Sequence, residues 1–171
     1  MILAAVLGIA PAAFGNKVLF DGDQNPLPNT QTRLDPENTD TDNRVASWTP
    51  GEKMRDLTIV PDDKDWSRFS GISLRIHVNE VESHELVVIC DSNPEGATDY
   101  NYFFTKIPID WKGWKTVVIP FENFTKARSP AGWNKITCLK IQNYGWGSDP
   151  IPDAKYDFDD VTLLDAVENT K

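Results

Sequence analysis

The stretch GISLRIHV at residues 71–78 shows the clearest alternation of apolar and polar side chains in the chain. The apolar positions are Ile72, Leu74, Ile76 and Val78. The polar positions between them are Ser73, Arg75 and His77. Because successive side chains of a β-strand point to opposite faces, this pattern predicts a strand with one face in a core. The other face meets solvent or a ligand.

Short β-branched and aromatic runs recur on both sides of this segment, separated by Gly, Pro, Asn and Asp, and no long helical periodicity interrupts them. The candidate strands are residues 17–20, 44–48, 55–60, 71–78, 84–90, 100–107, 113–120, 136–142 and 156–164. About nine short strands with turn signals between them predict an all-β fold, a two-sheet antiparallel β-sandwich. The polar segment 21–43 is expected to be a long surface loop, which could cover a sheet edge. The segment 121–133 is expected to hold at most one helical turn.

Length and charge restrict the function classes. A chain of 171 residues, 40% of them hydrophobic, fits one domain with a substantial core. The formal net charge of −9 opposes nonspecific attraction to nucleic acids or anionic membranes. Beyond the first residues, no apolar run approaches the roughly 18 residues that a membrane span needs. We therefore expect no nucleic-acid partner and no membrane partner.

Residues 1–16, MILAAVLGIAPAAFGN, have the apolar character of a signal peptide and contain an A-x-A cleavage pattern at residues 10–12. No Lys or Arg precedes Lys17, so the usual positive region is missing. An apolar strand or helix of the fold is the alternative. The sequence predicts a signal peptide at 1–16, a single β-sandwich domain at 17–171, and a secreted protein in an extracellular or periplasmic location.

Catalytic signatures are sparse. The chain has two histidines, His77 and His84, and lacks a nucleophile elbow, a zinc-protease motif and a glycine-rich phosphate loop. Its two cysteines, Cys90 and Cys138, lie in strand-like runs, where two free, buried thiols are favoured over one disulfide. We expect a protein that is not an enzyme.

The last candidate strand, YDFDDVTLL (156–164), carries carboxylates in line with strand hydrophobes. Strict alternation places Asp157, Asp159, Val161 and Leu163 on one face and Phe158, Asp160, Thr162 and Leu164 on the other. A buried carboxylate needs a partner, and calcium is bound by Asp and backbone oxygens. We predict a structural calcium site that uses Asp21 or Asp23 together with Asp159; exposed acids at strand ends are the alternative.

Aromatic residues are the main binding candidates. Planar rings stack on the apolar faces of pyranoses while polar neighbours bond the hydroxyl groups. Tyr144 and Trp146 lie in a Gly-rich loop within 142–152, where aromatic side chains have less core to fill. Trp111 lies in a turn beside Lys112 and could also contact a ligand.

A second aromatic group is expected on a sheet face. Tyr100 and Tyr102 share a strand face with Phe104 and Lys106, opposite Phe103, Thr105 and Ile107. If Phe103, Thr105 and Ile107 face the core, Tyr100 and Tyr102 line an open sheet face. Arg75 and His77 could then join the two tyrosines in a groove. An ordinary solvated sheet face is the alternative. Trp66 and Trp133, each just before a strand, are expected in the core.

Four segments carry a family resemblance: DWSRFSGISLRIHV (65–78), DWKGWKTVVIPFENF (110–124), AGWNKITCLKIQNYGWG (131–147) and YDFDDVTLL (156–164). Together they resemble β-jelly-roll, galactose-binding-like carbohydrate-binding modules associated with bacterial polysaccharide lyases and glycoside hydrolases. The resemblance implies a non-catalytic, calcium-containing domain that holds a polysaccharide or oligosaccharide on a concave sheet face or in loops at one end. It implies Asp159, and less surely Asp21, as calcium ligands, and an interior position for Trp114. It also implies a catalytic lyase or hydrolase domain encoded elsewhere as a partner. We expect a monomer.

The sequence leaves two alternative functions open. A small jelly-roll polysaccharide lyase would use a Tyr with a His or Arg to abstract a proton beside a uronate, but the R-[ST]-E-[LV]-R and Q-[IV]-H signatures of such lyases are absent from the sequence. An adhesion domain would bind protein through the same aromatic surface.

Overall fold

The computed structural model describes residues 15–23, 27–28, 30–38, 42–51, 56–80, 83–145, 147, 151 and 154–166. These residues form eleven strands and two short 3-10 helices. The strands in the first half are β1 (Lys17–Phe20), β2 (Gln31–Leu34), β3 (Arg44–Trp48), β4 (Asp56–Ile59), β5 (Phe69–Val78) and β6 (His84–Asp91). The remaining strands are β7 (Tyr102–Ile109), β8 (Gly113–Pro120), β9 (Thr125–Ala127), β10 (Cys138–Gln142) and β11 (Tyr156–Asp165), with helices at Phe121–Asn123 and Trp133–Lys135.

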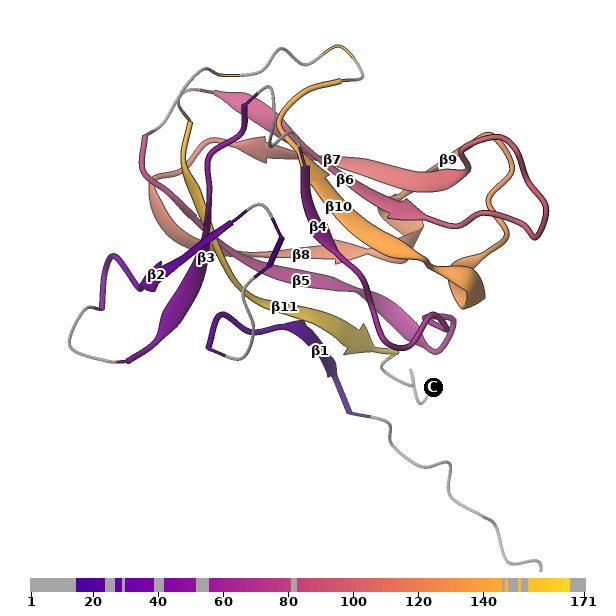
Figure 1. Ribbon diagram of the computed structural model, residues 1–171, viewed down its shortest axis with the longest axis horizontal. Coiled ribbons are helices and arrows are strands. Elements are labelled where there is room, and N and C mark those ends of the chain that lie inside the picture. The colour runs from indigo at the N-terminus through magenta and orange to yellow at the C-terminus, as the bar shows by residue number, and fades with distance from the viewer. Residues whose placement is uncertain are drawn as a thin grey trace, which may run out of the picture.

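The strands form two antiparallel sheets packed face to face (Figure 1). The six-stranded sheet has the order β2-β3-β11-β5-β8, with β1 also paired to β11. The five-stranded sheet has the order β4-β10-β6-β7-β9. The fold is therefore the all-β, two-sheet jelly-roll sandwich that the sequence predicts.

Apolar side chains from both sheets meet in one core, because alternation sends every second residue of each strand inward. Its largest fully buried members include Trp48, Trp66 and Phe158. At one end of the sandwich, the ring of Trp133 stacks on the ring of Phe121 with centroids 3.8 Å apart. The prediction that Trp66 lies in the core is confirmed, whereas Trp133 is partly buried and packs against the core.

Two strands lie where the sequence predicts loops. β2 falls inside the polar segment 21–43, and it pairs with β3 at the edge of the six-stranded sheet with all four residues exposed. β9 follows the helical turn at Phe121–Asn123 and adds three residues beside β7. Edge strands of this kind have little apolar alternation, so the sequence pattern does not reveal them.

Alternation is interrupted in β11, and this corrects the face assignment of its second half. Asp157 and Asp159 pair with His77 and Arg75, but the register shifts between Asp159 and Thr162. Asp160, within the shift, has a φ of 46°. The extra residue of the bulge turns Val161 and Leu163 into the core, on the face opposite to Asp157 and Asp159.

The two tryptophans of the segment 110–124 are both partly buried, and a ligand contact by Trp111 stays a prediction. Trp114 is opposite His77 in the β5–β8 ladder, on the outer face of the six-stranded sheet, so its predicted interior position is wrong. Trp111, a predicted ligand contact in a turn, packs against the core, and its indole nitrogen is buried without a hydrogen-bond partner among the described residues. Gly113, with a φ of 79°, turns the chain between them.

Residues 1–14 of the predicted signal peptide lie outside the described residues, and the domain boundary at residue 17 stays a prediction. In the part of the chain that the structure describes, no helix is long and apolar enough to cross a membrane.

Candidate functional site

The outer face of the five-stranded sheet has an apolar floor along β6. Val87 and Ile89 point away from the core cluster, yet their exposed fractions are 0% and 2%. Their cross-strand neighbours on this face carry long side chains, namely Lys140 and Gln142 on β10 and Phe104 and Lys106 on β7. The longer side chains on either side therefore cover Val87 and Ile89. We call this outer surface of the five-stranded sheet the glycan face, because the family resemblance implies a glycan on a sheet face.

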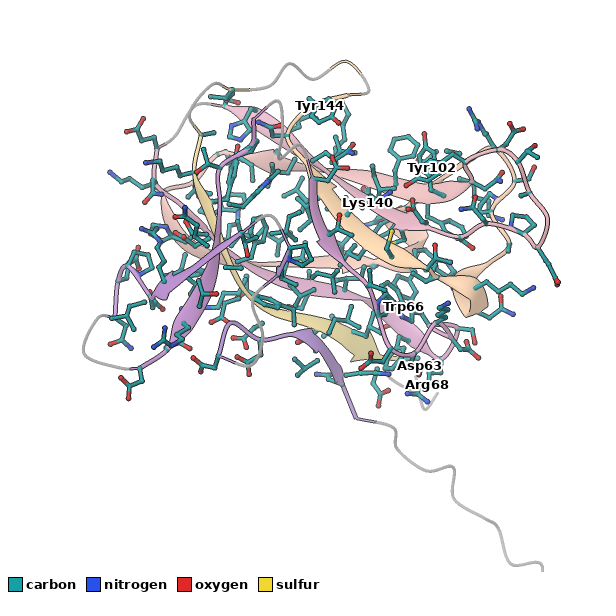
Figure 2. All side chains as sticks on the ribbon, in the orientation of Figure 1. Asp63, Trp66, Arg68, Tyr102, Lys140 and Tyr144 are labelled. Carbon is teal, nitrogen blue, oxygen red and sulfur yellow. The ribbon has the colours of Figure 1, made fainter. Side chains whose placement is uncertain are left out.

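An aromatic row lies on the same face, beside Val87 and Ile89. Tyr100, Tyr102 and Phe104 follow one another, with ring centroids 5.4 Å apart for the two tyrosines and 6.1 Å apart for Tyr102 and Phe104. The predicted sharing of one face by these residues and Lys106 is confirmed by the pairing of β6 with β7. Figure 2 shows Tyr102 on β7 and Lys140 on β10, the two strands that flank β6. Such a row of rings offers flat apolar surfaces at the spacing of neighbouring residues along a strand.

A buried carboxylate lies at the end of this row. Asp91 is 3% exposed, and its Oδ2 lies 2.7 Å from the ammonium of Lys140. The same oxygen accepts hydrogen bonds from the hydroxyl of Tyr100 and, at 2.8 Å, from the thiol of Cys138. Lys140 also donates to the Tyr100 hydroxyl and lies 4.6 Å from the centroid of its ring. The four side chains form a closed cluster across β6, β10 and the turn that precedes β7.

This cluster fixes its own protonation states at neutral pH. Burial and the hydrogen bond to Asp91 raise the pKa of Tyr100 above its usual value. Burial lowers the pKa of Lys140, but its bonds to Asp91 and Tyr100 outweigh that effect and raise the pKa overall. Burial, together with Asp91, raises the pKa of Cys138 to about 12. Tyr100 therefore remains a donor, Lys140 a cation and Cys138 a thiol.

Further charges on the glycan face are paired. Lys106 lies 2.6 Å from the carboxylate of Glu85 on the neighbouring strand. Gln142 donates a hydrogen bond of 2.6 Å to Asp56. The face therefore offers polar groups beside its aromatic row without a strong local excess of positive charge.

Arg75 and His77 lie on the other side of the molecule, so the predicted common groove with Tyr100 and Tyr102 is wrong. Both residues belong to β5 of the six-stranded sheet and point outward, beside Trp114. The sequence shows that each pair of residues has an outward face, but it does not show that the two faces belong to different sheets. A separate sugar contact by Arg75 or His77 stays a prediction.

The outward side chains of β5 are engaged by the segment that follows β2. Arg75 lies 3.3 Å from Asp35 and 3.9 Å from the centroid of the Trp114 ring. Trp114 donates a hydrogen bond of 2.9 Å to Asp35. His77 Nε2 lies 3.2 Å from Glu37. These contacts attach one edge of the six-stranded sheet to its centre.

The predicted calcium ligands meet at one corner, but Asp159 does not fit a calcium site as it is arranged. Asp159 Oδ1 accepts from the amide of Gly22 at 3.1 Å, which brings Asp21 and Asp23 near. Its Oδ2 lies 2.9 Å from Arg75, whose charge already neutralises it. Among the described residues, no three His, Cys, Asp or Glu side chains are grouped as metal ligands. A calcium site that uses Asp21 or Asp23 together with Asp159 would require Asp159 to leave Arg75, and it stays a prediction.

The sequence also bears on family membership. The model of the carbohydrate binding domain (family 11) matches residues 18–150, which is most of the chain. The chain belongs to this family. It is thus a non-catalytic carbohydrate-binding module, as the sequence predicts, rather than a lyase or a protein-binding adhesion domain. No curated protein matches the sequence.

Solved structures share the fold of this family 11 module. A family 11 module from Clostridium thermocellum, in complex with a β-1,3-1,4-mixed-linked tetrasaccharide, is 17% identical, with a TM-score of 0.66 over 92% of this chain and 100% of that one. The family 11 module of a cellulosomal cellulase from the same organism is 18% identical, with a TM-score of 0.67 over 94% and 100%. A family 30 module from a cellulosomal cellulase of that organism is 11% identical, with a TM-score of 0.62 over 91% and 100%.

The remaining predicted contacts of the family 11 module concern the loop after β10. Tyr144 is half-buried at the end of the strand that carries Lys140, and Figure 2 places it at one end of the sandwich. Trp146 lies outside the described residues. Sequence reasoning missed Asp91 and Lys140, because a charged residue on a strand does not reveal its partner and only the pairing of β6 with β10 brings the two together.

Proposed function

We propose that this module binds a neutral β-glucan chain along the glycan face. The single observation that carries the proposal is the aromatic row beside the Asp91–Lys140 pair on an open sheet face. Aromatic rings stack on the apolar faces of pyranoses, and the adjacent polar groups bond to hydroxyls. The tetrasaccharide in the related family 11 complex is a mixed-linkage one, which supports a β-linked glucan as the first ligand to test.

Charge supports a neutral chain. Lys140 and Lys106 are each paired with a carboxylate on a neighbouring strand. The whole chain carries a formal charge of −9. A polymer of uronates or sulfated sugars would therefore meet little uncompensated positive charge on this face and a repulsive field from the molecule as a whole.

The test is titration of barley mixed-linkage β-glucan into the protein by calorimetry, with Tyr102→Ala as the variant. Removing the central ring of the aromatic row is expected to weaken binding about tenfold, because aromatic stacking and the burial of the ring together are worth about 1.4 kcal/mol.

The matched control is Val118→Ala on the outer face of the six-stranded sheet, where Val118 is 57% exposed. This variant should bind like the wild type. Equal loss in both variants, or no loss in Tyr102→Ala, would contradict binding on the glycan face and favour the loops at the end of the sandwich, where Tyr144→Ala and Trp146→Ala are the variants to test.

Secretion, a monomeric state and a catalytic lyase or hydrolase partner are further parts of the proposal. The apolar residues 1–16 support export, and the cellulosomal cellulase that holds a related family 11 module supports an enzymatic partner. Amino-terminal sequencing of the exported protein tests secretion and cleavage of the signal peptide. Light scattering of the purified protein tests the monomeric state.

A further inference from the structure

Tyr100 is the one ring of the aromatic row that no strand holds. β7 begins at Tyr102, and Tyr100 lies in the turn before it with an exposed fraction of 41%. Its carbonyl oxygen accepts a hydrogen bond of 3.2 Å from Arg128, which restrains the backbone. A ring in such a turn can adopt other staggered χ1 rotamers unless its side chain is tied down.

Asp91 supplies that tie. The Tyr100 hydroxyl donates to Asp91 Oδ2, the oxygen that also faces Lys140 and Cys138. The other oxygen, Oδ1, is buried without a hydrogen-bond partner among the described residues. The contacts at Oδ2 therefore carry the stabilisation of this buried charge, and the cluster has one compact arrangement.

Asp91 also neutralises the positive charge of Lys140. Lys140 lies 2.7 Å from it, and the Lys140 side chain is 21% exposed, so a chain on the glycan face can approach the ammonium. Asp91 itself is 3% exposed and cannot be approached in the same way. Removal of the carboxylate would leave a reachable positive charge beside the aromatic row.

We propose that Asp91 is a positioning and specificity residue of the glycan face: it holds the ring of Tyr100 for stacking and neutralises Lys140 against anionic chains. The inference rests on the proposed function, because both effects act on a glycan bound to this face. Asp91 acts through Tyr100 and Lys140 and makes no contact with the sugar.

The first experiment is a double-mutant cycle of Tyr100→Phe and Asp91→Ala with barley β-glucan. Each single variant is expected to weaken binding about threefold, because the freed ring distributes over three staggered rotamers. The double variant should also lose about threefold rather than about ninefold, since both changes break the same tie. An additive loss would overturn the positioning role and indicate that the Tyr100 hydroxyl contacts the sugar directly.

The second experiment compares carboxymethyl cellulose with neutral β-glucan. In Asp91→Ala, the ratio of the two affinities should shift about fivefold toward the anionic polymer at low salt, the upper range of an exposed ion pair. The shift should disappear near 1 M salt, where screening acts within about 3 Å. The matched control, Asp91→Ala with Lys140→Met, should show no shift. An unchanged ratio in Asp91→Ala would overturn the specificity role.

Different results would contradict the proposed function and the role of Asp91. If the wild type does not bind β-glucan, the proposed function is wrong. If the wild type binds and Tyr100→Phe binds equally well, the positioning role alone is wrong. This variant is expected to fold, because it loses one hydroxyl and keeps the ring. Should Asp91→Ala unfold, Asp91→Asn keeps the volume, removes the charge and serves the specificity experiment.

Discussion

At the scale of single residues, Asp160 is one of two non-glycine residues with a positive φ in the described part of the chain, and Arg128 is the other. Asp160 has a φ of 46° in the bulge of β11, a region that Asn and Asp tolerate better than other non-glycine residues. Partial burial, followed by the charges of Asp159, Asp21 and Asp23, raises the pKa of Asp160. The charged form of Asp160 is therefore less stable in the folded protein than in the unfolded chain.

Asp160→Asn is expected to stabilise the protein at pH 7 by a few tenths of a kcal/mol, because it removes the repulsion and suits the same backbone region. Because the pKa of Asp160 is raised, its charge destabilises the folded protein above that pKa, and this destabilisation vanishes as Asp160 becomes protonated. The gain should thus disappear below about pH 4. Urea unfolding of the wild type and Asp160→Asn at pH 7 and below about pH 4, with chelator present, measures this difference in stability. Destabilisation at pH 7, or a chelator-sensitive difference between the proteins, would instead support a bound cation at this corner.

At the scale of elements, the β2–β3 hairpin is joined to β5 and β8 through Asp35. Burial raises the pKa of Asp35, but the amide of Glu37, the indole of Trp114 and the guanidinium of Arg75 outweigh it and lower the pKa below its usual value. The Trp114 side chain thus serves as an anchor for an edge hairpin rather than as part of the core. Polar contacts perform here the role that apolar packing performs elsewhere in the sandwich.

The stability that Asp35 contributes should be present above about pH 4 and lost as the pH falls, since a lowered folded pKa favours the charged form. Asp35→Asn is expected to cost about 2 kcal/mol at pH 7, the range of hydrogen bonds to charged groups. The difference between wild type and variant should shrink toward pH 2.5. Urea midpoints measured from pH 7 to pH 2.5 test this. Parallel pH profiles would show that Asp35 is not charged in the folded protein.

At the scale of the whole molecule, the two ends of the described fold meet on the sheet away from the glycan face. The amide of Asp165 donates to the side chain of Asn16 at 3.0 Å, and both β1 and β11 belong to the six-stranded sheet (Figure 1). A tether at either end leaves the glycan face open. The two cysteines are free, and neighbouring positions in the β6–β10 ladder place Cys90 in the core and Cys138 on the glycan face.

Thiol titration should therefore distinguish the two cysteines. Cys138 is expected to react slowly with a maleimide at pH 7.5, because its raised pKa leaves little thiolate, and Cys90 only after unfolding, because it is fully buried. Reductant should not change the melting temperature. Rapid labelling of both thiols in the folded protein would contradict the described packing, and resistance of both thiols after unfolding would indicate a disulfide.

Local sequence was sufficient for nine of the eleven strands in the described residues, all but β2 and β9, and for most of the faces within them. Alternation has a period of two residues, so GISLRIHV and the segment from Tyr100 to Lys106 reveal their inner and outer faces without knowledge of any neighbour. The same logic failed in β11, because a bulge depends on the partner strands. It also missed β2, whose side chains are all exposed.

Tertiary structure alone decided which outward faces share a surface. Arg75 and Tyr102 each alternate outward, but strand order assigns them to different sheets, and thus to opposite sides of the sandwich. Asp91 and Lys140 meet because β6 pairs with β10, a contact between segments distant in the sequence. Pairing and register depend on hydrogen bonds and packing between such segments, and these interactions leave no periodic signal within either one.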